Sequence, residues 1–247
     1  MQLKTLVASS RPPFLLLTLA SVFLGYAAAG LATDVVDTRL LLPVLAGALS
    51  AHASVNLLNE YFDFRSGLDL LTRRTPFSGG SGALPADPDS AAAVMMAGFA
   101  MLAISIATGL YLVRAVGPGI LLVGIPGVLL VVAYTQWLTR RPWLCLVAPG
   151  LAFGPLMVAG SAFVFNGQYT VAAVIASMVP FFLVSNLLLL NQYPDVAADR
   201  AVGRRHLLVV HGARTGAAVY VAFTADNLTP VAMSSFSLAR LLYRCWV

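Results

Sequence analysis

Two acidic segments interrupt an otherwise apolar chain, and together they hold half of its carboxylates. The first segment runs from Asn56 to Asp69 and the second from Asn191 to Asp199. Of the ten Asp and Glu residues in the chain, five lie in these segments: Glu60, Asp63, Asp69, Asp195 and Asp199. Carboxylates in or beside a membrane span are costly, which makes them functional candidates. If the two segments face each other, their oxygens suit Mg²⁺, and Mg²⁺ in turn binds phosphates.

In the first segment, helical spacing relates the polar side chains to one another. Asn56 and Glu60 are four residues apart, as are Asn59 and Asp63. Residues at this spacing share one face of a helix. We therefore expect two amides and two carboxylates to point into one cavity.

The second segment repeats a four-residue step through Asn191, Asp195 and Asp199. Pro194 is expected to bend or end the preceding helix and to turn these acids toward the site. Asp and Asn also cap helix ends, so helix capping explains one such segment. Two segments that follow separate apolar runs favour a shared site instead.

A loop rich in Gly and Ser follows the first segment, from Arg73 to Pro85. Its N–H groups can bind an anion, so we expect an ordered lid over a phosphate; a flexible linker is the alternative. The pairs Arg140–Arg141 and Arg204–Arg205 are further candidates for phosphate contact, because the guanidinium fork suits phosphate. A role in membrane topology alone is the alternative for both pairs.

The apolar runs around these segments are long enough to cross a membrane. The chain is 59% hydrophobic and 10% charged, with a mean hydropathy of +0.85, whereas soluble proteins carry about 25% charged residues. A membrane helix needs about 20 mostly apolar residues. The runs are continuous and not alternating, which predicts an all-α polytopic bundle. Seven spans are predicted: 13–33, 40–58, 90–112, 118–137, 144–165, 170–190 and 207–225. The first run is longer than a signal-peptide core, so we expect a retained helix.

Basic residues predict the orientation of these spans. With the N-terminus inside, the inner loops hold eleven Lys and Arg residues, and the outer loops hold Arg39 and Arg114. This bias predicts an integral membrane protein whose N-terminus and both acidic segments are cytoplasmic. The basic residues are scattered over separate loops, which argues against a nucleic acid partner. Neither the two cysteines nor the three histidines have the spacing of metal ligands, so we expect packing or interfacial roles for them.

The two segments and the loop between them resemble the UbiA superfamily of intramembrane prenyltransferases. The resemblance rests on Asn56-x-x-Asn59-Glu60-Tyr61-Phe62-Asp63-x-x-x-Gly67-x-Asp69, Thr75–Pro85 and Asn191-x-x-x-Asp195-x-x-x-Asp199, and covers about residues 10–222. Within the superfamily, the Gly67-x-Asp69 ending resembles the 1,4-dihydroxy-2-naphthoate prenyltransferases of menaquinone biosynthesis. The resemblance implies a nine-span bundle, a cavity open to lipid, an aromatic acceptor, and a prenyl diphosphate bound with Mg²⁺ as cofactor.

The resemblance also implies roles for individual residues. Glu60 stands where Asp is commoner in the family, and Tyr134 with the basic pair after it resembles an element that contacts the diphosphate. The expected catalytic residues are Asp63, Asp195 and Tyr134. The expected substrate-binding residues are Asn56, Asn59, Asn191, Arg73, Arg140, Arg141 and Arg204. The expected metal ligands are Glu60, Asp63, Asp69, Asp195 and Asp199.

The end of the chain departs from the family pattern. Residues 226–247 contain no apolar run of 20 residues, where the family continues through two more spans. We therefore expect a membrane domain over 1–225, incomplete at its C-terminus, and an atypical tail over 226–247 from a truncated or frame-shifted end.

Three other functions are compatible with the sequence. The first is prenylation of another acceptor, of the hydroxybenzoate, haem or chlorophyll type. The second is a cation-coupled transporter, which also places carboxylates and broken helices in the membrane. The third is an inactive, truncated fragment. Transporter sites tend to lie near the bilayer midplane, whereas these segments lie at the ends of spans beside arginines, which favours the prenyltransferase.

Overall fold

The protein is a bundle of helices. The computed structural model describes residues 2–31, 36–75 and 79–246, with side chains as far as residue 226, and within these ranges it contains no strand. The long helices are α2 (Pro12–Gly30), α3 (Leu41–Arg65), α6 (Ala91–Val116), α7 (Leu121–Ala133), α10 (Val171–Gln192) and α12 (Leu207–Trp246). One further rod is formed by α8 (Pro142–Leu151), η5 (Ala152–Ala159) and α9 (Gly160–Asn166). The predicted all-α polytopic bundle is confirmed.

Within the described residues, six helices are long and apolar enough to cross a membrane. They are Pro12–Gly30, Thr38–Arg65, Pro88–Val116, Pro142–Asn166, Val171–Gln192 and Leu207–Asp226. Within the described residues, each of the seven predicted runs falls mainly on a helix, and residues 32–33 of the first run lie outside the described residues. The fourth run differs in length, because its helix ends at Ala133 and spans only Pro118–Ala133.

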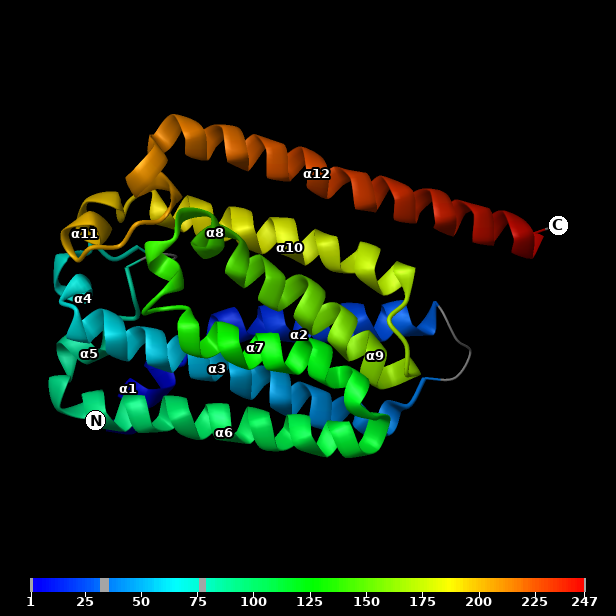
Figure 1. Cartoon of the computed structure of the whole chain (residues 1–247), viewed down its shortest axis with the longest axis horizontal. Helices are drawn as coiled ribbons and strands as arrows, with labels where there is room; N and C mark the ends of the chain where they lie inside the picture. The colour runs from blue at the N-terminus through cyan, green and yellow to red at the C-terminus, as the bar shows by residue number, and fades with distance from the viewer. Residues whose placement is uncertain (1, 32–35, 76–78, 247) are drawn as a thin grey trace.

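Four short helices gather at one end of the bundle. The short helices are α1 (Gln2–Ser9), α4 (Leu68–Leu71), α5 (Ala83–Ala86) and α11 (Val196–Ala201). The short turns are η1 (Thr38–Leu40), η2 (Pro88–Ser90), η3 (Pro118–Ile120) and η4 (Leu138–Arg140). Figure 1 shows α1, α4, α5 and α11 at the same end, so the two acidic segments, which lead into α4 and α11, finish side by side.

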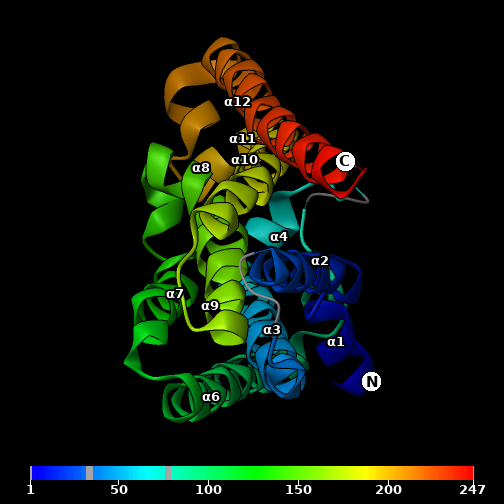
Figure 2. The same ribbon diagram turned by 90° about the vertical axis from the view of Figure 1, so that its right-hand side faces the viewer.

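Close helix contacts position the two acidic segments relative to each other. Helix α3 packs along α6, while α10 lies between the α8–η5–α9 rod and α12 (Figure 2). A Cβ atom at Gly25 would lie 2.5 Å from the Val158 carbonyl oxygen, and one at Gly150 would lie 2.3 Å from the Phe181 carbonyl oxygen. These glycines let α2 and α10 approach the rod to backbone contact, as small residues do in membrane bundles.

The middle of the rod is a π-helix, Ala152–Ala159. Pro155 lies inside this stretch and has no backbone N–H, so the ordinary helical hydrogen bond is lost there. Wider π turns of this kind are often found near functional sites.

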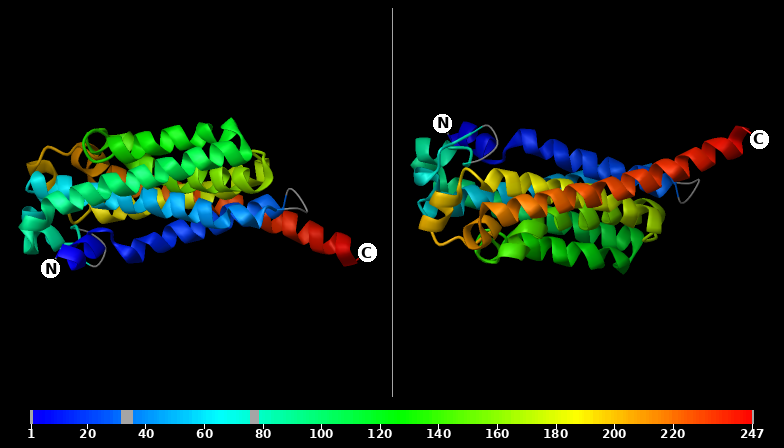
Figure 3. Two further views of the ribbon diagram at one scale, coloured as in Figure 1. Left: turned by 90° about the horizontal axis from the view of Figure 1, so that it is seen from below. Right: turned by 90° about the horizontal axis from the view of Figure 1, so that it is seen from above.

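Helix α12 lies along α10 and continues past the bundle, as both views in Figure 3 show. It bends at Gly212, where the backbone leaves helical geometry (φ 80°, ψ 171°). The Asn186 amide nitrogen donates to the Tyr220 carbonyl oxygen and to the Thr224 hydroxyl, each at 3.1 Å, which fastens α12 to α10. The backbone is helical on both sides of residue 226, and the predicted domain division at that position stays a prediction.

Candidate active site

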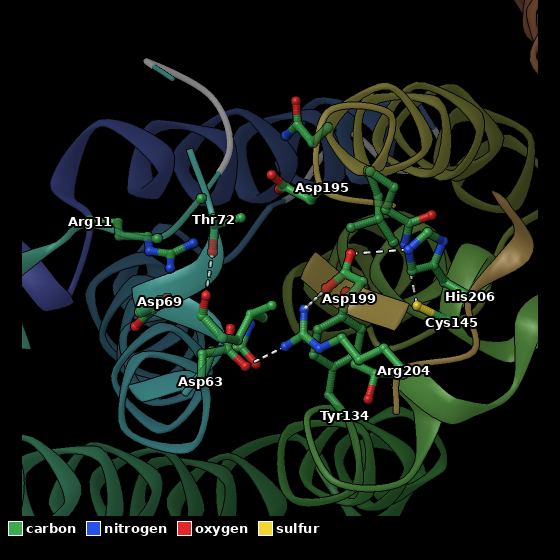
Figure 4. Close-up of a pocket in the computed structure, with 18 residues that line it drawn as sticks. Arg11, Asp63, Asp69, Thr72, Tyr134, Cys145, Asp195, Asp199, Arg204 and His206 are labelled. Atoms are coloured by element: carbon green, nitrogen blue, oxygen red, sulfur yellow. Dashed lines mark hydrogen bonds and ion pairs between the residues drawn. The ribbon is translucent and has the colours of Figure 1, made fainter. Parts of the chain in front are cut away.

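A pocket of about 140 Å³ lies where α3, α4, α10 and α11 end. Four carboxylates line it: Asp63, Asp69, Asp195 and Asp199. Two guanidinium groups line it as well, those of Arg11 and Arg204. Figure 4 shows the carboxylates on opposite sides, with Arg204 between Asp63 and Asp199. The two acidic segments therefore face each other across one space.

The pocket brings together eight of the thirteen predicted residues. These are Asn59, Asp63, Asp69, Tyr134, Asn191, Asp195, Asp199 and Arg204. The five that do not line it are Asn56, Glu60, Arg73, Arg140 and Arg141. Arg73, Arg140 and Arg141 are exposed, and their predicted contact with substrate stays a prediction. Residues 76–78 of the predicted lid lie outside the described residues.

The first acidic segment divides into two stripes on α3. A helix turns about 100° per residue, so the Asn59–Asp63 stripe and the Asn56–Glu60 stripe face different neighbours. Asn59 and Asp63 face the pocket, and Oδ1 of the Asn59 side chain accepts a hydrogen bond from the Thr135 hydroxyl. The Asn56 amide instead donates to the Ser10 carbonyl oxygen at 3.0 Å. The expected single cavity thus receives one stripe and not both.

Glu60 lies on the Asn56–Glu60 stripe, which does not line the pocket, and its side chain is fully buried. Its Oε2 accepts from Arg11 Nη2 at 3.0 Å and from the Ser81 backbone N–H at 3.1 Å. Its Oε1 accepts from the Ser81 hydroxyl. Both oxygens are therefore engaged by protein donors, whereas Asp69 and Asp195 in the pocket each have one buried oxygen without a hydrogen bond.

The second segment reaches the pocket as a whole because the helix ends within it. Helix α10 ends at Gln192, and Asp195 lies directly before α11. The break falls just before Pro194, where the residue preceding proline is disfavoured in a helix. Asn191, Asp195 and Asp199 all line the pocket.

Arg204 links the two acidic segments through ion pairs. Its Nη2 contacts Asp63 on α3, and its Nη1 lies 3.2 Å from Asp199 Oδ1 on α11. Burial opposes the charge of Arg204, but Asp63 and Asp199 outweigh it and raise the pKa of the guanidinium above its ordinary value. The other oxygen of Asp199, Oδ2, lies 3.0 Å from His206 Nε2.

Among the described residues, no ion pair is formed by the other two pocket carboxylates, Asp69 and Asp195. Asp69 Oδ2 and Asp195 Oδ1 are buried without a hydrogen bond. Burial, with the charges of Asp63 and Glu60, raises the pKa of Asp69 to about 7. Burial, with the charge of Asp199, raises the pKa of Asp195 to about 6. Four carboxylates against two guanidinium groups leave the pocket short of positive charge.

Several pocket residues had no signal in the sequence that marked them for the site. Arg11 was visible only as a basic residue before an apolar run, and His206 only as a histidine without ligand spacing. Both line the pocket, together with Leu68, Thr72, Thr139, Cys145, Leu188 and Gln192. Gly79 and Gly80 also line it, and they belong to the predicted lid. Arg11 joins because α2 begins at Pro12, beside the end of α3, and this contact between distant segments has no local pattern.

The chain belongs to the UbiA prenyltransferase family, whose family model matches residues 9–246. It is 26% identical over 206 residues to the 1,4-dihydroxy-2-naphthoate octaprenyltransferase of Bacillus subtilis (strain 168), a match over 82% of this chain. The chain spans 64% of the length of that relative. With its apolar helices and this family, it is an integral membrane protein.

Two solved structures share the fold. One is a UbiA homolog from Archaeoglobus fulgidus bound to DMAPP and Mg²⁺, with a TM-score of 0.71 at 16% identity. The other is a UbiA homolog from the same organism bound to GPP and Mg²⁺, with a TM-score of 0.72 at 15% identity. Each match covers 93% of this chain and 77% of the other chain.

Proposed function

We propose that the protein transfers a prenyl group from an isoprenyl diphosphate to an aromatic acceptor in a reaction that depends on Mg²⁺. The observation that carries this proposal is the pocket in which carboxylates from two distant segments meet beside two arginines. The family, and homologous structures described as bound to DMAPP or GPP with Mg²⁺, support it.

The donor set of the pocket fits Mg²⁺, which prefers oxygen ligands. Asp63, Asp69, Asp195 and Asp199 would hold the metal, since Asp69 and Asp195 have buried oxygens free to accept a ligand. Among the described residues, no three His, Cys, Asp or Glu side chains are already grouped as a metal site, and Arg204 holds Asp63 and Asp199 instead. Bound Mg²⁺ would act as a Lewis acid that stabilises charge on the leaving diphosphate.

The arginines of the pocket would bind the same leaving group. Prenyl transfer requires the allylic C–O bond to weaken, so negative charge builds on the diphosphate as the carbon becomes cation-like. Arg11 and Arg204 line the pocket and can donate charge-assisted hydrogen bonds to phosphate oxygens. The amides of Asn59 on α3 and Asn191 on α10 also line the pocket and would orient the diphosphate.

Apolar surroundings would protect the reacting carbon from water. The 140 Å³ pocket is smaller than the roughly 300–1,000 Å³ of typical ligand sites, so it suits a diphosphate headgroup while the prenyl chain lies along the apolar bundle. Tyr134 lines the pocket, and desolvation raises the pKa of its phenol well above the ordinary value. A neutral tyrosine ring can stabilise an allylic cation through its face.

We propose 1,4-dihydroxy-2-naphthoate as the acceptor. The name of the Bacillus subtilis relative supports this choice, as does the Gly67-x-Asp69 ending of the first segment. On this proposal the chain acts in menaquinone biosynthesis, with the pocket on the cytoplasmic side of the inner membrane. Acceptors of the hydroxybenzoate, haem or chlorophyll type are the competitors that the experiment must include.

One assay tests the function. Membranes containing the full chain are incubated with a radiolabelled prenyl diphosphate and a panel of aromatic acceptors, in Mg²⁺ or in excess EDTA. We expect labelled naphthoate product in Mg²⁺ and none in EDTA. Membranes with Asp199→Ala at matched expression serve as the control. Transfer that persists undiminished in EDTA would overturn the metal-dependent mechanism, and the absence of transfer to every acceptor would overturn the proposed activity.

A further inference from the structure

Glu60 is the only glutamate in the chain, and it is fully buried. A buried charge is costly unless it is paired and hydrogen-bonded. Glu60 meets this condition through two neighbours, Arg11 and Ser81, which donate three hydrogen bonds to its two oxygens. These neighbours come from segments that lie far from α3 in the sequence.

Ser81 belongs to the loop Gly79–Gly82, which lies against the acids of the pocket. Gly79 and Gly80 line the pocket, and the Gly79 backbone donates a hydrogen bond to Asp195. A Cβ atom at Gly80 would lie 2.7 Å from Asp69 Oδ1, and its φ of +74° also favours glycine. Three successive residues of the loop therefore each contact a different carboxylate, and the Ser81 contact anchors the loop to α3.

Arg11 forms the second wall that Glu60 holds. It joins α1 to α2, and it is the only non-glycine residue of the described ranges with positive φ (52°). A backbone conformation of this kind persists only where the surroundings hold it. Arg11 lines the pocket, and its Nε is buried without a hydrogen-bond partner. The ion pair with Glu60 at 3.0 Å fixes where this guanidinium lies.

We propose that Glu60 is a positioning residue, which fixes Arg11 and the Gly79–Gly82 loop as two walls of the pocket and does not bind the metal. This inference rests on the proposed function for the identity of the pocket's ligand. The two stripes of α3 then have different roles, because Asp63 faces the ligand while Glu60 faces Arg11 and the Gly79–Gly82 loop. It also gives a reason for glutamate at this position, since the longer side chain reaches both Arg11 and Ser81.

Two substitutions separate positioning from metal binding. Glu60→Gln keeps the shape of the side chain but removes the charge that holds Arg11. Ser81→Ala removes one donor to Glu60 and leaves every pocket carboxylate in place. Asp199→Asn is the matched variant for loss of a proposed metal ligand, and Asp89→Asn, which is exposed, is the neutral control.

Two readouts require no turnover. Hydrogen–deuterium exchange of peptides covering residues 79–86 reports the loop, and titration of the purified full chain with Mg²⁺ alone reports the metal. We expect Glu60→Gln to speed exchange of the loop about tenfold while changing Mg²⁺ affinity by less than about threefold. Asp199→Asn should weaken Mg²⁺ beyond the roughly 10–100-fold expected for partners outside the ligand set. In the transfer assay, Glu60→Gln should raise KM for the prenyl diphosphate.

The possible outcomes distinguish a positioning role of Glu60 from a role in metal binding. If Glu60→Gln weakens Mg²⁺ as much as Asp199→Asn does, Glu60 is a ligand and the proposal is wrong. Unchanged loop exchange in Glu60→Gln also overturns it. If Glu60→Gln does not fold, Ser81→Ala decides at loop amides other than that of Ala83, whose N–H donates to the Ser81 hydroxyl. Faster exchange at those amides supports the proposal, and unchanged exchange refutes it. If Asp199→Asn leaves Mg²⁺ affinity intact, the proposed metal site fails, and the loop readout still tests the positioning role.

Discussion

The two acidic segments have the same four-residue spacing but reach the pocket differently. The first lies on α3, which continues to Arg65 and keeps its residues in helical register. The second breaks after Gln192 and resumes at Val196. All three residues of the four-residue step in the second segment, Asn191, Asp195 and Asp199, line the pocket, whereas only one stripe of the first segment on α3 does so.

The difference shows what a spacing pattern does and does not determine. In an unbroken helix, residues four apart lie on the same face, so each four-residue series forms one stripe along the helix. Two such series that begin at different residues lie side by side and face different neighbours. Which stripe faces the ligand depends on what packs against the helix. On α3 the Asn59–Asp63 stripe lines the pocket, whereas the Asn56–Glu60 stripe is hydrogen-bonded to Ser10, Arg11 and Ser81. A break in the helix, as at Pro194, releases the following acids from this constraint.

The largest expected loss of activity comes from substitution of the carboxylates that face the ligand. Asp63→Asn and Asp195→Asn should each lower prenyl transfer by about 10²–10³-fold, because a lost ligand removes charge stabilisation from the leaving group. The variants are compared in membranes at matched expression. Asp89→Asn, outside both segments and exposed, should retain turnover. Equal loss in all three variants would show that the segments have no special role.

The second effect concerns the arginine that joins the segments. Arg204→Gln leaves Asp63 and Asp199 buried without their guanidinium partner, which should destabilise the metal-free protein by about 3 kcal/mol. Mg²⁺ should then stabilise the variant more than it stabilises the original chain, because metal and guanidinium no longer compete for these oxygens.

Melting curves of the purified protein in EDTA and in Mg²⁺ measure both changes. Arg205→Gln is the matched control, since this neighbouring arginine is exposed. A smaller Mg²⁺ stabilisation in Arg204→Gln than in the original chain would mean that the arginine assists metal binding and does not compete with it.

Much of the fold followed from the sequence, because membrane spans are local and continuous. Within the described residues, each of the seven apolar runs falls mainly on a helix, and the break before Pro194 follows from the chemistry of proline. The shortness of the fourth helix did not follow, since the predicted run extends to Trp137, whereas the helix ends at Ala133, before Tyr134, Thr135 and Gln136.

The site was predictable where a motif carried it and not where tertiary contacts built it. Asp63, Asp195 and Asp199 can be recognised in the sequence as acids beside apolar runs. Arg11 and His206 line the pocket because they lie at the ends of other helices. The sequence around each of them has no residue spacing that predicts a place in the site. Glu60 is the reverse case: it belongs to the motif, but its carboxylate is hydrogen-bonded to the Gly79–Gly82 loop and does not line the pocket.

A smaller effect should distinguish the two amides on α3. Asn59→Ala removes a side chain that lines the pocket, and we expect about a tenfold loss of prenyl transfer with little change in stability. Asn56→Ala removes a hydrogen bond to Ser10 and should cost about 1 kcal/mol of stability with turnover nearly unchanged. Transfer rates and melting temperatures of both variants make the comparison. Similar profiles for the two would mean that α3 presents a single face to the ligand.

The smallest effect concerns an acid outside both segments. Asp87 Oδ2 accepts from the Thr5 hydroxyl at 2.7 Å and from the Ser90 hydroxyl at 2.6 Å, and so ties α1 to the start of α6. Asp87→Asn weakens both bonds, which should cost about 1 kcal/mol and lower the melting temperature by about 2–4 °C. Mg²⁺ affinity should stay the same, because Asp87 does not line the pocket. Asp89→Asn, two residues away and exposed, should change neither quantity. A loss of Mg²⁺ affinity in Asp87→Asn would show that α1 and the pocket are coupled, and that the boundary drawn between structural and ligand-facing acids is wrong.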